Sequence, residues 1–223
     1  MSDWAVIFDV DGVLLELTHA EEELFFQPFA SRIDATVLSR DWNSYAVRND
    51  EDIVKEIVAR YRLPPHDVEL IRTEYLALLE SELASGLNSE PIAGTGELLA
   101  ALAPHARLGI ATANFRQAAQ LRLMQAGLWQ GVCDLAFGAD GGGHKSAILS
   151  RAIAASGLPP DRIIYIGDNV NDVVAGIRNQ VHFIGFSVDQ ARLLALQAAG
   201  AKRISSNHAT TEMLVLSVID GAG

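Results

Sequence analysis

Two aspartates lie two residues apart, directly after the first apolar run of the chain. Residues 4–8 (WAVIF) have the pattern of a buried parallel strand, and the DVDG that follows places Asp9 and Asp11 where the chain leaves the sheet. At this spacing both carboxylates can face one pocket while Val10 faces away. One carboxylate of such a pair can be a nucleophile and the other a general acid/base, which indicates group-transfer chemistry.

A second pair of acids follows a later apolar run. Asp168 and Asp172 lie in GDNVND, and their spacing of four predicts that they share one side of a loop or first helical turn. Together with Asp9 they would form an oxygen-rich site suited to a hard, octahedral cation. Magnesium fits this set better than zinc, because the sequence has no Cys/His cluster.

A hydroxyl and a lysine supply what a phosphate group would need. Thr112 ends a predicted strand and precedes a predicted helix that begins near Phe115, where free backbone N–H groups and a hydroxyl favour phosphate binding. Lys145 follows the glycine run 141–143 and begins another helix, so its charge can offset phosphate and acids. These residue types suit phosphoryl transfer, which depends mainly on positioning and charge neutralisation.

Alternating strands and helices must hold these residues. Parallel strands covered by helices on both faces are expected from this alternation, which predicts a doubly wound, three-layer α/β domain. In such a fold the residues at the carboxyl ends of the strands meet at one edge of the sheet. The predicted strands are 4–8, 107–112, 133–137, 162–166, 181–185 and 202–205, and the predicted helices are 95–103, 115–126, 146–156, 171–179 and 189–199.

The segment after the first strand has a different texture. Residues 14–88 lack buried strand patterns and show helical periodicity in three places. These are residues near 19–30, a segment for which Asn49 or Asp50 can be the N-cap, and residues 67–83. We therefore expect an α-helical domain at 14–88, inserted into a core made of 1–13 and 89–223.

Composition excludes several classes of partner. The formal net charge is −11, which disfavours nucleic acid and anionic membranes. A single cysteine, Cys133, allows no internal disulfide and is read as a small apolar residue. No signal peptide or apolar run of membrane length is visible, so we expect a soluble, cytoplasmic protein, either a monomer or a homodimer.

Four segments together resemble a known family. DVDGV at 9–13, the strand end at Thr112, Lys145 and GDNVND at 167–172 are similar, in order, to the motifs of the haloacid dehalogenase-like superfamily. The resemblance spans nearly the whole chain and implies a Rossmann-like core. The helical insert resembles the cap of the branch that holds phosphoglycolate phosphatases and beta-phosphoglucomutases.

The resemblance implies roles for the reacting groups. Asp9 would be the nucleophile and a metal ligand. Asp11 would be the general acid/base and would also bind metal through its backbone carbonyl. Lys145 would stabilise Asp9 and the phosphate, and Asp168 would bind Mg²⁺ with Asp172 as a second or outer acid.

The same resemblance implies which residues hold the substrate. Thr112, Ala113 and Asn114 would hold the transferring phosphate. Arg48, in the loop before the Asn49-capped helix, would reach into the site and bind a second anionic group; a solvated surface side chain is an equal alternative for this residue.

The function expected is Mg²⁺-dependent hydrolysis of a small-molecule phosphate monoester through an aspartyl-phosphate, because Asp11 is similar to the phosphatase and phosphomutase pattern. A phosphomutase of the beta-phosphoglucomutase type is the nearest alternative. A non-catalytic scaffold that binds a partner or a phosphometabolite is a third. Phosphoglycolate, a sugar phosphate and a nucleotide monophosphate all stay open as substrates.

Overall fold

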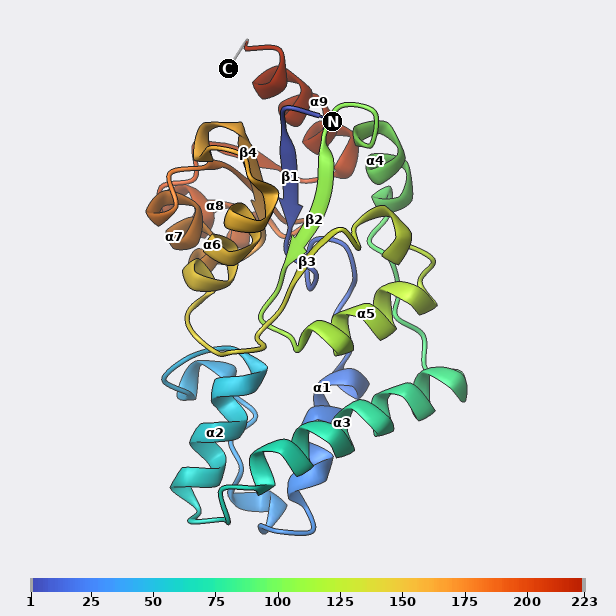
Figure 1. The fold of residues 1–223 in the computed structure, drawn as a ribbon, viewed down its shortest axis with the longest axis vertical. Coiled ribbons are helices and arrows are strands. Elements are labelled where there is room, and N and C mark those ends of the chain that lie inside the picture. The colour runs from blue at the N-terminus through green and yellow to red at the C-terminus, as the bar shows by residue number, and fades with distance from the viewer. Residues whose placement is uncertain (1, 222–223) are drawn as a thin grey trace.

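A six-stranded parallel sheet forms the centre of the molecule. The computed structural model describes residues 2–221, and its strand order is β3-β2-β1-β4-β5-β6, with every pair parallel (Figure 1). The chain runs outward from β1 in one direction and then from β4 in the other, so the order reverses beside β1. The strands are β1 (Ala5–Phe8), β2 (Arg107–Ala111), β3 (Leu135–Phe137), β4 (Ile163–Gly167), β5 (His182–Phe186) and β6 (Arg203–Ser205).

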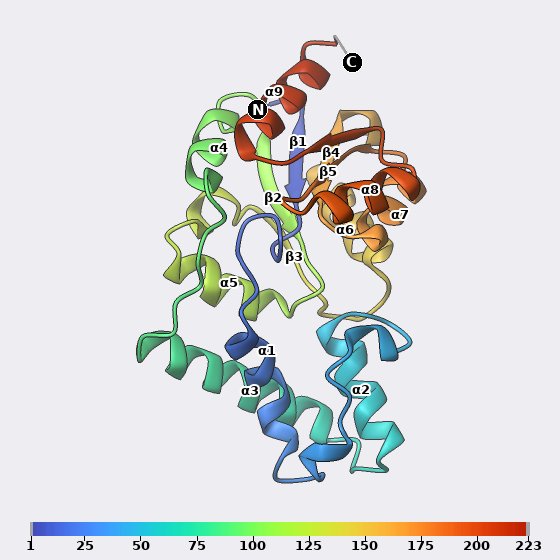
Figure 2. The same cartoon turned by 180° about the vertical axis from the view of Figure 1, so that it is seen from behind.

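Helices cover both faces of this sheet, as the alternating pattern predicted. Along β1, Val6 and Phe8 enter one apolar cluster while Ala5 and Ile7 enter another. The first cluster is covered by α4 (Thr95–Leu102), α5 (Arg116–Gln125) and α9 (His208–Ile219). The second is covered by α6 (Lys145–Ser156), α7 (Val170–Arg178) and α8 (Gln190–Ala198) (Figure 2). The core is therefore a doubly wound, three-layer α/β domain.

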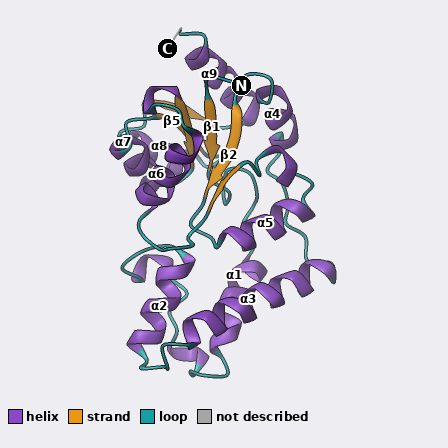
Figure 3. Ribbon diagram, in the orientation of Figure 1, coloured by secondary structure: helices purple, strands orange, loops and turns teal. Residues whose placement is uncertain are grey.

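A helical cap lies beyond the carboxyl ends of the strands (Figure 3). It contains α1 (His19–Phe26), α2 (Asp50–Arg60) and α3 (Asp67–Ala84), and its own cluster buries Phe29, Ile57 and Ile71 completely. Ala118 of α5 and Phe115, the N-cap residue of that helix, belong to the same cluster, so a helix of the core domain contributes to the interior of the cap. Within residues 2–221, no helix combines the length and apolarity needed to cross a bilayer.

Two adjacent chain segments join the cap to the core. Leu15 pairs with Pro91 in an antiparallel bridge, and the Glu16 N–H donates to the Glu90 carbonyl at 2.9 Å. Leu14 and Leu15 pack in the core cluster. The division of the chain at 13/14 and 88/89 stays a prediction.

The elements predicted from the sequence are present, with one omission. Each predicted strand is found, and the predicted helices of core and cap begin and end within a few residues of the observed ones. The sequence analysis missed α9 (His208–Ile219). Its β-branched residues resemble strand composition, yet His208, Thr211, Val215 and Val218 are buried at helical spacing, which was the signal available.

The cap cluster offers a stability test on two neighbouring residues of α3. Ile71 is fully buried, whereas Leu70 is 44% exposed. We expect Ile71→Ala to lower the free energy of unfolding by about 2–5 kcal/mol, because it removes buried methylenes and leaves a cavity. Leu70→Ala should cost less than about 1 kcal/mol. Urea denaturation of both variants measures the difference, and equal losses would contradict the assigned face of α3.

Candidate active site

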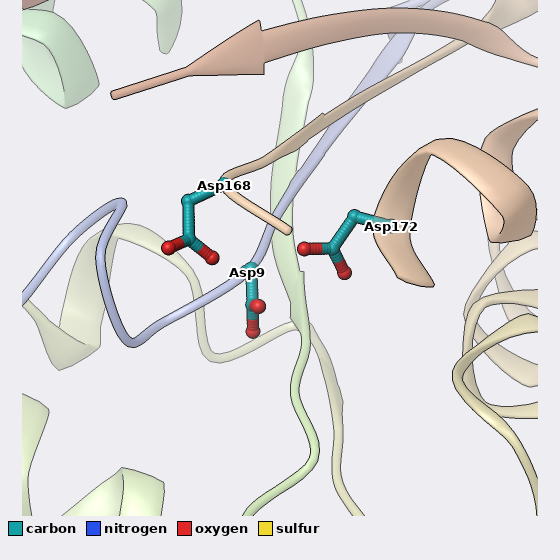
Figure 4. A group of neighbouring side chains, drawn as sticks. All are labelled: Asp9, Asp168 and Asp172. Atoms are coloured by element: carbon teal, nitrogen blue, oxygen red, sulfur yellow. The ribbon is translucent and has the colours of Figure 1, made fainter. Parts of the chain in front are cut away.

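Three buried aspartates converge at the carboxyl ends of β1 and β4 (Figure 4). Asp9 follows β1, Asp168 follows β4, and Asp172 lies in the first turn of α7. Each offers a carboxylate oxygen within 4.8 Å of the others. This edge of the sheet, beside the reversal of strand order, is where doubly wound folds bind ligands.

Lys145 is the cation that joins two of these acids. It is the first residue of α6, and its Nζ lies 2.7 Å from Asp9 Oδ2 and 3.3 Å from Asp172 Oδ1. Its side chain is 10% exposed. Burial alone lowers the pKa of Lys145, but Asp172 and Asp9 raise it above its ordinary value overall, so the amine is protonated.

Asp172 is held by donors of the protein. Tyr165 Oη donates to Asp172 Oδ1 at 2.6 Å, and the Asn169 N–H donates to Asp172 Oδ2 at 3.0 Å as part of a capping box. Both oxygens are thus engaged, and one of them also contacts Lys145. The contacts fit a carboxylate that orients Lys145 and borders the cluster.

Asp168 lies against the loop that follows Asp9. Gly12 has φ 74°, and a Cβ at this position would lie 2.4 Å from Asp168 Oδ2, so the close approach requires glycine. Arg192, at the start of α8, forms an ion pair with Asp168 Oδ2. Burial, with Asp172, raises the pKa of Asp168 to about 6, while Arg192 opposes the shift.

The crowding of acids affects Asp9 most. Burial raises the pKa of the Asp9 carboxyl well above its ordinary value; Lys145 opposes this shift, and Asp172 and Asp168 add to it. Carboxylates this close are jointly ionised only when cations offset their repulsion. The donor set, oxygen alone and buried, therefore fits a hard divalent cation held by Asp9 and Asp168.

Asp11 faces a different cation. Its Oδ1 lies 2.6 Å from Arg122 Nη1, and its side chain is 23% exposed. Arg122 belongs to α5, far along the chain, and its side chain is only 3% exposed. The structure thus places Asp11 beside the aspartate cluster with its carboxylate engaged by a buried guanidinium.

The predicted phosphate-binding residues follow β2. Thr112 is buried, and its Oγ1 accepts the Asn114 N–H at 3.2 Å. Among the described residues, the Ala113 N–H has no hydrogen-bond acceptor in the protein and is available to a ligand. Asn114 Oδ1 lies 3.2 Å from Thr112 Oγ1, so the three residues form one tight turn at the sheet edge.

Two N–H groups at the start of α5 are already used within the protein. Asp50 Oδ2 accepts the N–H of Phe115, the N-cap residue, at 2.7 Å, and Asp140 Oδ2 accepts the Arg116 N–H at 2.7 Å, so these two are not free for phosphate. Asp50 comes from the cap, and its own N–H donates to the Ala113 carbonyl at 2.9 Å. A cap residue therefore holds the backbone just before a helix of the core domain.

A cavity of ≈ 800 Å³ opens between the cap and the strand ends. The aspartate cluster, Lys145 and the Thr112 turn line its core side, and Phe25, Trp42 and Arg48 line its cap side. Arg48 is half-buried and donates to Asn43 Oδ1 at 2.9 Å; among the described residues it pairs with no carboxylate. The cavity is large enough for a small organic phosphate.

Three residues that the sequence analysis missed contact the site. Arg122 shares the buried face of α5 with Ala118 and Ala119, and a charge on an apolar helical face was a signal available in the sequence. Asp50 and Arg192 gave no comparable signal, since their partners are distant in the chain.

Comparison with family models identifies the chain. Residues 5–179 match the model of the haloacid dehalogenase-like hydrolases. The match covers most of the chain and includes the β1 end, the cap and the β4–α7 segment. The protein therefore belongs to the haloacid dehalogenase-like hydrolases and is an enzyme of that family. Comparison with curated protein sequences gave no significant match.

Solved structures share this fold over almost their whole length. A predicted phosphatase from Clostridium acetobutylicum has a TM-score of 0.70 and 18% identity, with 97% of this chain and 100% of that chain covered. A haloacid dehalogenase family hydrolase from Deinococcus radiodurans R1, with bound phosphate and sodium, has a TM-score of 0.62 and 22% identity, covering 97% and 96%. A putative beta-phosphoglucomutase from Bacteroides vulgatus has a TM-score of 0.70 and 16% identity, covering 98% and 89%. At these identities the likeness shows the fold.

The buried Asp50 carboxyl predicts a pH effect on stability. Burial raises the pKa of Asp50 to about 8, although the hydrogen bond from the Phe115 N–H acts in the opposite direction. Because the folded state then holds a proton that the unfolded state has lost, its contribution to stability falls as pH rises from about 4 to about 8.

Asp50→Asn should flatten this dependence, because the amide keeps the acceptor for the Phe115 N–H and does not ionise. The difference in unfolding free energy between Asp50→Asn and wild type should grow in favour of the variant as pH rises through this window. Urea denaturation at several pH values measures it, and a difference that is constant with pH would contradict the assignment.

Proposed function

We propose that the protein is a phosphatase that hydrolyses a small-molecule phosphate monoester through an aspartyl-phosphate on Asp9. One observation carries the proposal: the Asp9 carboxylate, paired with Lys145 at 2.7 Å, lies at the sheet edge where a cavity of ≈ 800 Å³ meets it. Family membership supports hydrolysis, and the acid, hydroxyl and lysine content supports phosphate as the group transferred.

In the first half-reaction a carboxylate oxygen of Asp9 attacks phosphorus, and the bond from phosphorus to the ester oxygen breaks. Asp11 gives its proton to the departing alcohol. Lys145 lies beside Asp9 and offsets the charge of the phosphoryl group, while the Thr112 hydroxyl and the Ala113 N–H hold its oxygens.

In the second half-reaction Asp11 takes a proton from water, and the resulting hydroxide attacks phosphorus. The Asp9–phosphate bond breaks, which releases phosphate and restores the Asp9 carboxylate. Closure of the cap over the cavity would keep bulk water away during the first half-reaction.

The cofactor we propose is Mg²⁺. Asp9 and Asp168, together with the backbone carbonyl of Asp11, would hold it, and Asp172 would act from outside this set because both its oxygens accept donors of the protein. When bound, the ion supplies positive charge that offsets both the carboxylate repulsion and the phosphate. The cluster contains carboxylates alone, which favours a hard cation over zinc.

The proposed partner is the small phosphate ester, rather than nucleic acid or a membrane, since the net charge of −11 repels both. We further propose a cytoplasmic location, which the single cysteine supports. A monomer or a homodimer is the assembly proposed.

The first test is phosphate release from a panel of small phosphate monoesters. Wild type should release phosphate with Mg²⁺ and lose this activity with chelator. Asp9→Asn should lower kcat by on the order of 10³-fold or more, because the nucleophile is removed. Asp134→Asn, an exposed acid distant from the cluster, is the matched control and should keep its activity.

Release that survives Asp9→Asn would overturn the nucleophile. Isomerisation of a sugar phosphate without net phosphate release would instead favour the phosphomutase. Metal binding without turnover on any ester would favour the scaffold.

Arg48 predicts a substrate preference. Since Arg48 lines the cavity and has no carboxylate partner within residues 2–221, we propose that it binds a second anionic group of the substrate. Arg48→Ala should raise KM by roughly 10- to 100-fold for esters with a second anion and should change KM little for esters of neutral alcohols. Lys55→Ala, which breaks an exposed pair with Glu51 on the cap, is the control. An equal rise in KM for both ester classes would argue against this role.

A further inference from the structure

A buried arginine occupies the face of α5 that packs into the molecule. Ala118, Ala119 and Leu123 of α5 are buried, and Arg122 shares their face with its side chain 3% exposed. Removing a guanidinium from water is costly unless its N–H groups find acceptors. The acceptors of the Arg122 N–H groups therefore indicate which parts of the protein this residue positions.

The nitrogens of Arg122 make their three shortest hydrogen bonds to three different segments, and Nη1 also lies 3.5 Å from Asn114 Oδ1. Nη1 lies 2.6 Å from Asp11 Oδ1, in the loop after β1. Nη2 lies 3.0 Å from the Glu16 carbonyl, in the first connection to the cap. Nε lies 2.7 Å from Glu21 Oε1, in the first cap helix, α1. The Arg122 side chain of the core thus links Asp11, the proposed general acid/base, to the first connection and the first helix of the cap.

Glu21 extends this junction to the second connection. Its Oε1 also accepts the Ser89 hydroxyl at 2.7 Å, and its Oε2 accepts the Thr18 N–H and hydroxyl at 3.0 and 2.9 Å. Burial raises the pKa of Glu21, but Arg122 and the Thr18 N–H lower it overall, so the group is a carboxylate at neutral pH. Both connections therefore contact Glu21, which is itself hydrogen-bonded to Arg122.

We propose that Arg122 is a positioning residue that fixes the orientation of the Asp11 carboxyl and, through Glu21, ties that orientation to the position of the cap. The inference rests on the proposed function, in which Asp11 passes a proton to the leaving alcohol. When the cap moves about its connections, Glu21 moves with α1, and the Arg122 side chain and Asp11 must adjust together. Asp11 is then correctly placed for proton transfer only in one cap position.

Direct substrate binding by Arg122 does not fit these contacts. All three nitrogens already donate to oxygens of the protein, and the Glu21 carboxylate offsets the charge of the guanidinium. A phosphate would have to displace one of them. Arg48, which has no carboxylate partner among the described residues, is the better anion site.

The test compares two leaving groups in Arg122→Gln and Arg122→Lys. p-Nitrophenolate leaves with little help from a proton, whereas an alkyl alcohol needs one. Single-turnover rates of leaving-group release with Mg²⁺ isolate the first half-reaction. Arg122→Gln should slow release of the alkyl alcohol by about 100-fold, the scale of general acid catalysis, and release of p-nitrophenolate by less than about 10-fold. Arg122→Lys keeps the positive charge but loses the planar set of donors of the guanidinium. Its rate of alkyl alcohol release should therefore lie between those of wild type and Arg122→Gln.

A second measurement does not depend on turnover. Hydrogen exchange of the backbone amides of residues 10–18 and 85–91 should be faster in Arg122→Gln and in Glu21→Gln than in wild type, because the tie between loop and cap is cut. Glu23→Gln is the matched control on the same helix: its partner Arg40 is exposed, and the variant should leave both exchange and the leaving-group ratio unchanged.

The outcomes separate the alternatives. Equal rate losses for both leaving groups with unchanged exchange, or a rise in KM alone, would overturn the positioning role in favour of a structural or substrate-binding one. If wild type releases no phosphate from any ester, the proposed function fails, while the exchange data still decide whether Arg122 joins the loop to the cap. If Arg122→Gln does not fold, Arg122→Lys and Glu21→Gln carry both measurements.

Discussion

Repulsion among buried carboxylates is the constraint around which this molecule is organised. Asp9, Asp168 and Asp172 approach within 4.8 Å at the end of a parallel sheet, away from water that would screen them. Lys145 spans Asp9 and Asp172, and Tyr165 and the Asn169 N–H hold Asp172 in place. The remaining excess of negative charge fits the divalent cation that we propose for the site. The doubly wound fold makes this possible because every strand delivers its last residues to the same edge.

A second group of charges lies where the cap meets the core. Arg122 and Glu21 form a buried pair that contacts both connections between core and cap, and the cap residue Asp50 accepts the N–H of Phe115 just before α5. Buried ion pairs add little net stability, but they are strongly specific for one arrangement of their partners. Such contacts favour a single position of the cap relative to the core.

Local sequence patterns were enough to predict the aspartate cluster, but they did not predict contacts between residues that lie far apart in the chain. Asp9 and Asp168 directly follow apolar strands, so their place at the sheet edge follows from strand periodicity. Lys145 lies well beyond β3, and it was predicted from the glycine run before it and the helix that it begins. Arg122 reaches Asp11 across 111 residues, and Asp50 reaches Phe115 across 65, so neither contact has a local signature. Helix α9 was missed because its β-branched residues concealed a helical spacing of buried positions.

The contribution of α5 to the cap has a consequence for the modularity of the fold. Phe115 and Ala118 are part of the cap's apolar cluster, and the cap in turn supplies Asp50 as the acceptor for the N–H of Phe115, the N-cap residue of α5. The boundary in space therefore runs through a helix that the chain assigns to the core. A cap exchanged between relatives along the sequence boundary alone would bring neither the matching apolar surface nor the matching acceptor. The structural module is the cap together with α5, and we expect sequence changes in the cap to be accompanied by changes in α5.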